Sequence, residues 1–291
     1  MLLAPPYLKN GDKVILLSTA RKMNPTLVED TVKNLNNWGL EVVLGESTTA
    51  DHKQFAGDDA LRLRDFQKAL NNPDIKAIFC GRGGYGTVRI IDQLDFSAFL
   101  KSPKWIVGFS DVTYLHSLLN NQLYVQSLHA AMPSTYASTD TEAIEAIRKA
   151  LFGEPFEYPT TNNPNNRKGV MEGTVIGGNL SILYSITGTR SGFDSSGKIL
   201  FIEDLDEYIY HIDRMLINLK RSGKLDKLAG LLVGGMSDLK DHDIPFGLTV
   251  EEMILEHCAE SNFPILFDFP AGHIAQNWPI VLGKKMRLTV A

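Results

Sequence analysis

The sequence predicts an α/β protein with a doubly wound, mostly parallel N-terminal sheet and a β-rich α/β second part. Short apolar runs alternate with amphipathic segments through the first half of the chain. Buried strands that alternate with helices indicate βαβ units, which build parallel sheets covered on both faces. Residues 153–169 then bring together prolines and asparagines, a composition typical of an exposed linker. We therefore expect one domain at 1–152, a linker at 153–169 and a second domain at 170–291.

The order of the expected elements follows from the same periodicity. In the first half, strands are expected at 13–17, 41–44, 76–80 and 104–107, and helices at 26–38, 58–70, 87–94 and 111–120. After the linker, strands are expected at 170–176, 198–202, 229–233, 264–267 and 285–290, and helices at 179–186, 208–220 and 249–261. Ligands of parallel sheets bind at the carboxyl ends of the strands. The run GRGGYG at 81–86 and Ser110 both follow strands, so a site is expected there.

Composition and charge exclude several classes of protein. The chain has 291 residues, of which 44% are hydrophobic and 22% charged, and its net charge is -5. This balance provides no basic face for a nucleic-acid backbone. The N-terminal residues do not show the pattern of a signal peptide, and no apolar run reaches the roughly 20 residues that cross a bilayer. We expect a cytoplasmic protein in which Cys80 and Cys258 are buried free thiols.

Ser110 stands in the run GFSD, residues 108–111, where an expected strand gives way to an expected helix. A serine on such a turn can project its hydroxyl into a cleft, while the next backbone N–H helps to form an oxyanion hole. The nucleophile elbow G-x-S-x-G is only half matched, because Val112 replaces its second glycine. Ser110 or Asp111 could instead cap the following helix. Spacing alone favours the cap.

The run CGRGGYGTV, residues 80–88, is rich in glycine and carries Arg82. Glycines between a strand and a helix let backbone N–H groups approach an anion closely. The Arg82 guanidinium could hold a carboxylate or a phosphate in two hydrogen bonds. The run does not match a P-loop, and it fits the dinucleotide fingerprint poorly. A ligand-facing loop is favoured over a plain tight turn, and the ligand stays open.

Acidic residues and a histidine stand out in the second half. An apolar strand is followed by four acidic residues, Glu203, Asp204, Asp206 and Glu207. They either take part in catalysis or form an acidic cap on the next helix. His273 follows Pro-Ala-Gly in a loop, which makes it a candidate for acid–base chemistry or a surface histidine in a turn. The other histidines do not show the spacing of a zinc site, so no metal is expected.

Taken together, these stretches resemble the LD-carboxypeptidase family of serine peptidases, which includes muramoyl-tetrapeptide carboxypeptidases and microcin C immunity proteins. The motifs occur in the family's order over nearly the whole chain: PPYLKNGDKVILLSTA (5–20), GRGGYG (81–86), GFSD (108–111), GGNLS (177–181), FIEDLDEYIYHIDRML (201–216) and AGHIAQNWPIVLG (271–283). Two stretches depart from the family. STARKMNP (18–25) replaces a Pro-Ser pattern, and HAAMP (129–133) replaces a His-Gly-Pro run. The implied fold is a flavodoxin- or Rossmann-like domain followed by a β-rich domain.

The resemblance also implies a Ser-Glu-His triad divided between the two domains. Ser110 would be the nucleophile, His273 the general base and then the acid, and Glu203 the carboxylate that orients His273. Asp204 and Glu207 are the fallback candidates for the acid.

The remaining site residues implied by the resemblance surround Ser110. The backbone N–H of Asp111, together with one from Gly83 or Gly84, would form the oxyanion hole. Arg82 would hold the free carboxylate of the substrate, and Tyr85 is a further candidate for substrate binding. The mechanism implied needs neither a metal nor another cofactor.

The implied substrate is a short peptide that ends in a D-amino acid, namely a murein tetrapeptide that loses its terminal D-alanine during peptidoglycan recycling. The protein would then be a cytoplasmic hydrolase, a homodimer, with no nucleic-acid or membrane partner. One alternative substrate is a peptidyl-nucleotide antibiotic, whose base could stack on Trp278 or Tyr85. A different class of function is a non-catalytic module that binds a carboxylate or a phosphate.

Overall fold

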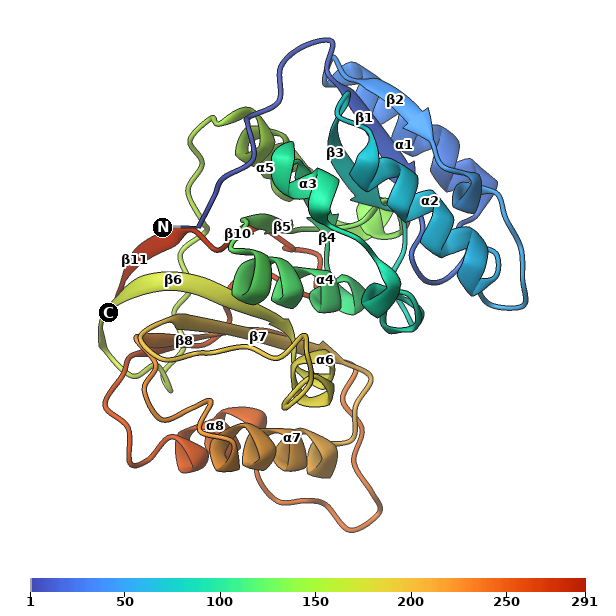
Figure 1. Cartoon of the computed structure of the whole chain (residues 1–291). Helices are drawn as coiled ribbons and strands as arrows, with labels where there is room; N and C mark the ends of the chain where they lie inside the picture. Colours follow the sequence, from blue (N-terminus) through green and yellow to red (C-terminus); the bar gives the residue numbers. More distant parts are fainter. Residues whose placement is uncertain (1) are drawn as a thin grey trace.

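The first sheet has six strands in the order β10-β5-β4-β3-β1-β2, in a computed structural model that describes residues 2–291 (Figure 1). The strands are β1 (Lys13–Leu17), β2 (Glu41–Leu44), β3 (Ile75–Cys80), β4 (Trp105–Gly108), β5 (Ser127–His129) and β10 (Ile280–Leu282). Strands β1 to β5 are parallel, and their order 2-1-3-4-5 is that of flavodoxin-like sheets. Strand β10 pairs antiparallel with β5. The predicted doubly wound sheet is confirmed.

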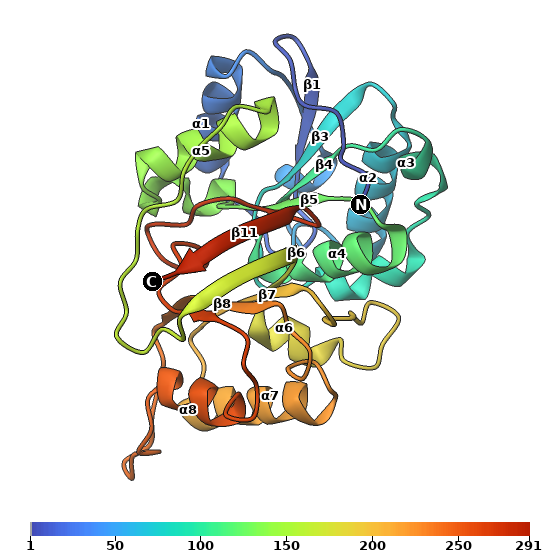
Figure 2. The ribbon, with the colours of Figure 1, turned by 90° about the vertical axis from the view of Figure 1, so that its left-hand side faces the viewer.

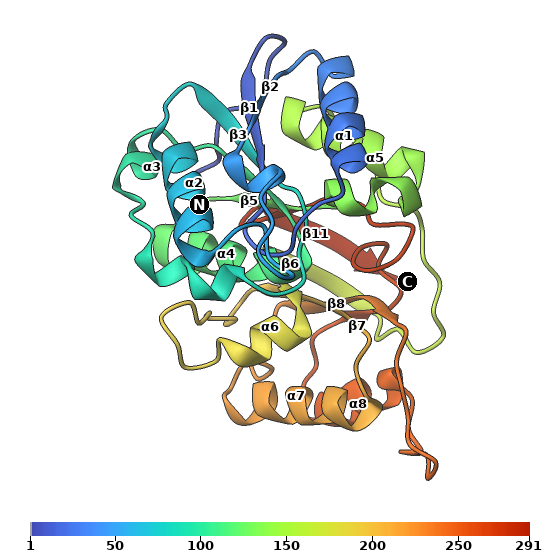
Figure 3. The ribbon, with the colours of Figure 1, turned by 90° about the vertical axis from the view of Figure 1, so that its right-hand side faces the viewer.

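Helices cover both faces of this sheet (Figures 2 and 3). One face carries α1 (Pro25–Asn37) and α5 (Thr141–Phe152), and the other carries α2 (Asp59–Asn71), α3 (Ser97–Lys101) and α4 (Thr113–Leu118). The alternation of side chains along a strand explains this arrangement. On β1, Val14 and Leu16 pack with α1 and α5, whereas Ile15 and Leu17 pack with α2 and α4.

The second sheet has five strands in the order β11-β6-β7-β8-β9. They are β6 (Gly169–Asn179), β7 (Ile199–Leu205), β8 (Gly230–Ser237), β9 (Ile265–Leu266) and β11 (Lys285–Val290). Strands β6 to β9 are parallel, and β11 lies antiparallel beside β6 (Figure 2). Helices α6 (Leu180–Ser185), α7 (Ile209–Arg221) and α8 (Val250–His257) pack on one face. The β-rich second part is therefore also confirmed.

Some expected elements differ from those observed. Residues 87–94 form two short 3₁₀ turns, η2 (Thr87–Arg89) and η3 (Ile91–Gln93), instead of one helix. The β-branched side chains at 87, 88, 90 and 91 lower helix propensity there. Strands β5 and β10, of three residues each, were not expected, because so short a run shows no periodicity.

Helix α4 connects the two halves, since it contacts β6 and α6 of the second half as well as β5 of the first (Figure 1). The segment from 154 to 168 contains no helix or strand, and Gly153 ends α5 in the left-handed conformation. Cys80 and Cys258 are buried and free, as predicted. Within residues 2–291, the helices are too short or too polar to cross a membrane.

Candidate active site

Ser110 lies on a strained turn between β4 and α4. Its backbone φ is 59°, in the left-handed region that non-glycine residues rarely occupy. The helical turns that begin here, η4 (Ser110–Val112) and then α4, are not capped by a hydrogen bond from a side chain. The helix-cap alternative therefore does not describe Ser110. A strained serine at a strand-to-helix turn is the geometry that exposes a nucleophilic hydroxyl.

His273 and Glu203 form a buried pair next to this turn. The His273 Nδ1 atom lies 2.6 Å from Oε2 of Glu203, and the His273 backbone N–H donates to the same oxygen. Glu203 is fully buried. Burial lowers the pKa of His273, but the Glu203 carboxylate more than offsets this, and the pKa lies above its ordinary value. The ring of Phe109, the residue before Ser110, packs on the imidazole with ring centroids 4.5 Å apart.

A β-bulge in the second sheet places the His273 loop over Glu203. Ile202 pairs with Val233 and Asp204 pairs with Met236, so the two glycines at 234 and 235 lie opposite Glu203 alone. The backbone N–H of Gly235 donates to the carbonyl of Ala271 at 2.9 Å. A Cβ at position 234 would collide with that same carbonyl oxygen. The paired glycines thus let the loop carrying His273 lie directly against the sheet.

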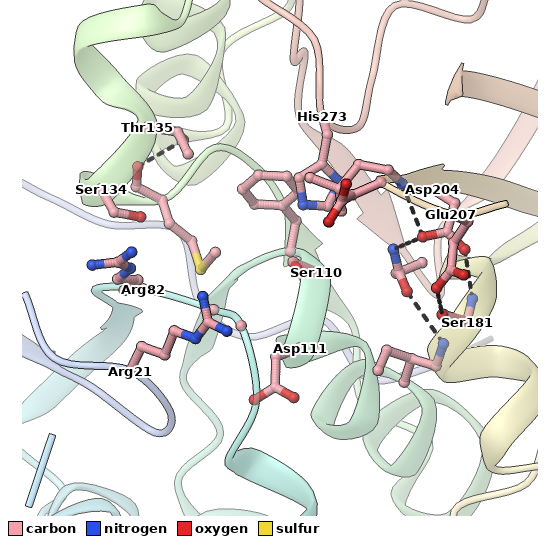
Figure 4. Close-up of a pocket in the computed structure, with 18 of the residues that line it drawn as sticks. Arg21, Arg82, Ser110, Asp111, Ser134, Thr135, Ser181, Asp204, Glu207 and His273 are labelled. Atoms are coloured by element: carbon pink, nitrogen blue, oxygen red, sulfur yellow. Dashed lines mark hydrogen bonds between the residues drawn. The ribbon is translucent and has the colours of Figure 1, made fainter. Parts of the chain in front are cut away.

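Ser110 and His273 line one pocket with a volume of about 670 Å³ (Figure 4). Three predicted oxyanion-hole residues, Gly83, Gly84 and Asp111, line it too. Gly83 lies against Ser110, since a Cβ built there would be only 3.2 Å from the Ser110 Oγ atom. A larger residue at 83 would have to push Ser110 or Met132 aside, so glycine suits the close approach of this loop. Among residues 2–291, no three His, Cys, Asp or Glu side chains lie close enough together to hold a metal ion.

The pocket walls carry opposite charges (Figure 4). Arg21 and Arg82 lie on one side, and Asp204 and Glu207 lie on the other. Asp206 is a further acidic residue of the lining. Arg82 donates to the Lys22 carbonyl at 3.1 Å. Such a pocket matches a ligand that carries both an anionic and a cationic group.

Two of the acidic groups on the second wall are held by hydrogen bonds. Glu207 accepts a hydrogen bond from the Ser181 hydroxyl at 3.1 Å, and its other oxygen lies 2.5 Å from the His211 Nδ1 atom. Asp204 accepts from Asn179 and from the backbone N–H of Ser181, each at 2.9 Å. Burial, and then the neighbouring Glu203 carboxylate, raise the pKa of Asp204 to about 7. The charge of this wall therefore changes near neutral pH.

Two aromatic residues named from the sequence lie away from Ser110. Tyr85 is 46% exposed, packs against Phe55, and is not among the residues that line the pocket. Trp278 packs on Phe156 and lines a separate cavity.

Sequence reasoning missed Arg21, Phe109 and Asn179, all of which line the pocket. Arg21 follows β1, which borders β3 at the point where the strand order reverses. Ligands of such sheets bind there, so the strand-end rule could have found Arg21.

The same fold and motifs occur in known proteins. A model described as the LD-carboxypeptidase N-terminal domain matches residues 13–130, and one described as the C-terminal domain matches residues 172–288. A protein of Bacillus subtilis named "Probable murein peptide carboxypeptidase" is 35% identical over 99% of this chain and 92% of its own length. The chain belongs to the LD-carboxypeptidase family. The resemblance inferred from the motifs is confirmed, and membership in this family makes the protein a serine-type carboxypeptidase.

Other LD-carboxypeptidase relatives and solved structures agree. The murein tetrapeptide carboxypeptidase of Pseudomonas aeruginosa is 29% identical over 92% of this chain and 90% of its own length. The crystal structure of muramoyltetrapeptide carboxypeptidase from Oxalobacter formigenes superimposes with a TM-score of 0.84 at 28% identity, covering 96% of this chain and 95% of the other. The microcin C7 self-immunity protein MccF superimposes with a TM-score of 0.86 at 23% identity, covering 99% and 96% of the two chains, and shares the fold.

Proposed function

We propose that this LD-carboxypeptidase releases the terminal D-alanine of murein tetrapeptides through a triad of Ser110, His273 and Glu203. The observation that carries the proposal is the buried pair of His273 and Glu203, 2.6 Å apart, in the pocket that the strained Ser110 also lines. A carboxylate on Nδ1 fixes the tautomer in which Nε2 is free to take a proton. A helix cap or a binding loop does not require that arrangement.

The chemistry proceeds through an acyl-enzyme. Ser110 Oγ attacks the scissile carbonyl carbon while His273 Nε2 takes the hydroxyl proton, and Glu203 stabilises the resulting imidazolium. The carbonyl oxygen becomes an oxyanion that accepts hydrogen bonds from the backbone N–H of Asp111 and of Gly83 or Gly84. Collapse of this intermediate breaks the C–N bond, and His273 returns the proton to the departing D-alanine amine. A water molecule, deprotonated by His273, then hydrolyses the ester and restores Ser110.

The charges of the pocket support a peptide of this kind. Arg21 and Arg82 match the free carboxylate that every carboxypeptidase substrate carries. Glu207, across the pocket, matches the side-chain ammonium of a diamino acid on the acyl side of the scissile bond. The names of relatives in B. subtilis and P. aeruginosa also point to murein peptides. We place the reaction in peptidoglycan recycling in the cytoplasm, carried out by a homodimer, on the strength of the family resemblance.

A peptidyl-nucleotide substrate is the second candidate, because MccF shares the fold over almost the whole chain. The positions of the two aromatic residues favour the murein peptide. Tyr85 does not line the pocket, and Trp278 lines a different cavity, so neither supplies a stacking surface beside Ser110.

The deciding experiment measures D-alanine release from a purified murein tetrapeptide by the wild type and by Ser110→Ala, in the presence of EDTA. We expect release by the wild type alone. Hydrolysis of a peptidyl-adenylate analogue without D-alanine release would favour the second candidate. Equal D-alanine release by both proteins would show that Ser110 is not the nucleophile. Binding of the tetrapeptide without turnover by either protein would indicate a binding module.

A further inference from the structure

Two buried ionisable side chains, Asp111 and Arg62, lie next to the glycine loop and have no part in the chemistry described above. Each is only 1% exposed. Asp111 follows Ser110 directly, whereas Arg62 comes from the first turn of α2. Burying such groups costs free energy unless hydrogen bonds compensate for it, so their partners indicate what they do.

Both side chains hold the same peptide group. The Nη1 atom of Arg62 donates to the Gly86 carbonyl at 3.1 Å and to the Thr19 carbonyl at 2.5 Å. The Oδ2 atom of Asp111 accepts the backbone N–H of Thr87 at 2.8 Å. The peptide bond between Gly86 and Thr87 is thus held at its carbonyl end by the Arg62 guanidinium and at its N–H end by a carboxyl oxygen of Asp111. A hydrogen bond from a guanidinium is stronger than one between neutral groups.

This arrangement joins the two chain segments that supply the oxyanion hole. One segment is the GRGGYG loop, which ends at Gly86 and presents Gly83 to Ser110. The other is the turn at Ser110, whose next residue, Asp111, offers its own backbone N–H. Because the Asp111 side chain reaches from the second segment to the first, it fixes the position of one donor relative to the other.

The arrangement is also costly. The Oδ1 atom of Asp111 and the Nε atom of Arg62 are buried without a hydrogen-bond partner among residues 2–291. Each unpaired buried polar atom typically costs about 1–3 kcal/mol. Arg62 also pairs with Asp59, which offsets part of its cost. Since apolar residues of similar size often stabilise such buried positions at least as well, we look for a role beyond stability.

We propose that Asp111 and Arg62 are positioning residues that hold the glycine loop in register with the Ser110 turn and thereby set the geometry of the oxyanion hole. The inference rests on the proposed serine mechanism, but it does not depend on which peptide is the substrate.

The test compares Asp111→Ala, which removes the acceptor, with Asp111→Asn, whose amide oxygen can still accept the Thr87 N–H. Two rates are measured: turnover of the tetrapeptide, and covalent labelling of Ser110 by a phosphonate reagent, which also forms an anionic centre in the oxyanion hole. Loss of one such donor typically costs about 10²–10³ in rate. We expect Asp111→Ala to slow labelling and kcat by about 10², with KM changed less than about twofold, and Asp111→Asn to recover most of both rates. Arg62→Met should show the same pattern with a smaller loss.

The control is Asp65→Ala. Like Asp111, Asp65 is a buried carboxylate that accepts a backbone N–H, but it lies on α2 and accepts from Ser47, at 2.9 Å. This control variant should lower the melting temperature without slowing the labelling of Ser110. If Asp111→Ala also lowers only the melting temperature, the proposal is overturned. If the wild type is labelled but releases no D-alanine, the proposed substrate is wrong. The labelling rates of the Asp111 variants then still test the positioning role of Asp111.

Discussion

The backbone conformation of Ser110 lowers the stability of the turn that carries the proposed nucleophile. Its left-handed φ of 59° places Cβ close to the following carbonyl, a conformation that costs about 1–2 kcal/mol in a residue other than glycine. Several contacts maintain it, among them the hydrogen bond from Val112 N–H to the Phe109 carbonyl and the packing of Phe109 on His273. The nearby fully buried His116 also holds the turn, since its Nε2 lies 2.8 Å from the Gly108 carbonyl.

We expect Ser110→Gly to be more stable than Ser110→Ala, by about 1 kcal/mol. Both variants lack the hydroxyl and should be inactive, so the difference isolates the backbone strain. Urea unfolding of the two variants under one set of conditions measures it. An alanine variant at least as stable as the glycine variant would contradict the strain.

A second prediction at this scale concerns the pKa of His273, which the Glu203 carboxylate raises against the effect of burial. His273 must be neutral to act as a base, so wild-type activity should fall as the pH drops through this raised pKa. In Glu203→Gln the main influence that raises this pKa is lost, while burial and the smaller effect of Asp204 remain. The acidic limb of kcat/KM should therefore move to lower pH, with kcat reduced by about 10³–10⁴.

The matched control is Glu260→Gln, an identical change at an exposed residue beyond α8. It should keep the wild-type pH profile. An acidic limb that stays in place in Glu203→Gln would mean that this limb does not report His273.

At the scale of elements, the bulge in β8 brings Glu203 and His273 together. Glu203 lies inside β7, two residues before the strand ends, and not after the strand expected at 198–202. Without the bulge, the pairing of β7 with β8 would continue unbroken past Glu203. The two glycines opposite Glu203 instead leave space for the 271–274 loop, and the Ser237 hydroxyl holds that loop through the His273 carbonyl at 2.9 Å.

Gly234→Ala should therefore separate His273 from Glu203, because its Cβ would displace the Ala271 carbonyl. We expect kcat to fall by at least tenfold, and the acidic limb of the pH profile to move in the same direction as in Glu203→Gln. Gly188→Ala is the control, because a Cβ there meets no atom within 4 Å and its φ of 83° imposes a backbone penalty on its own. Equal kcat values for the two variants would show that the bulge does not position the histidine.

At the scale of the whole molecule, the proposed catalytic residues come from two halves that also share a sheet. We propose the division into 1–152, a linker at 153–169 and 170–291, with the exception that β10 from the last part completes the first sheet against β5. One apolar cluster also extends from β1 and α4 to β7, α7 and α8. The halves are therefore expected to depend on each other for stability.

Separate production of residues 1–160 and 161–291 tests this dependence. We expect each fragment alone to be poorly folded, because it exposes the apolar surface that the other covers, and inactive, because Ser110 lies in one and His273 in the other. Mixing or co-expressing the fragments should restore folding, followed by circular dichroism, and also the labelling of Ser110. Two independently stable fragments would contradict the shared core.

The sequence by itself determined the class of fold, the family and the candidate residues. Strands and helices are assigned from the local periodicity of apolar residues, and this periodicity is visible in the sequence without coordinates. The motifs around Ser110, Glu203 and His273 are likewise local in the chain.

Only the tertiary structure decided which candidates meet. The backbone strain at Ser110, the pairing of Glu203 rather than Asp204 with His273, and the entry of Arg21 into the pocket depend on contacts between distant segments. The same holds for β10, whose three residues form a strand because β5 offers them an open edge. Such contacts are set by sheet register and side-chain packing over the whole molecule, and no local pattern encodes them.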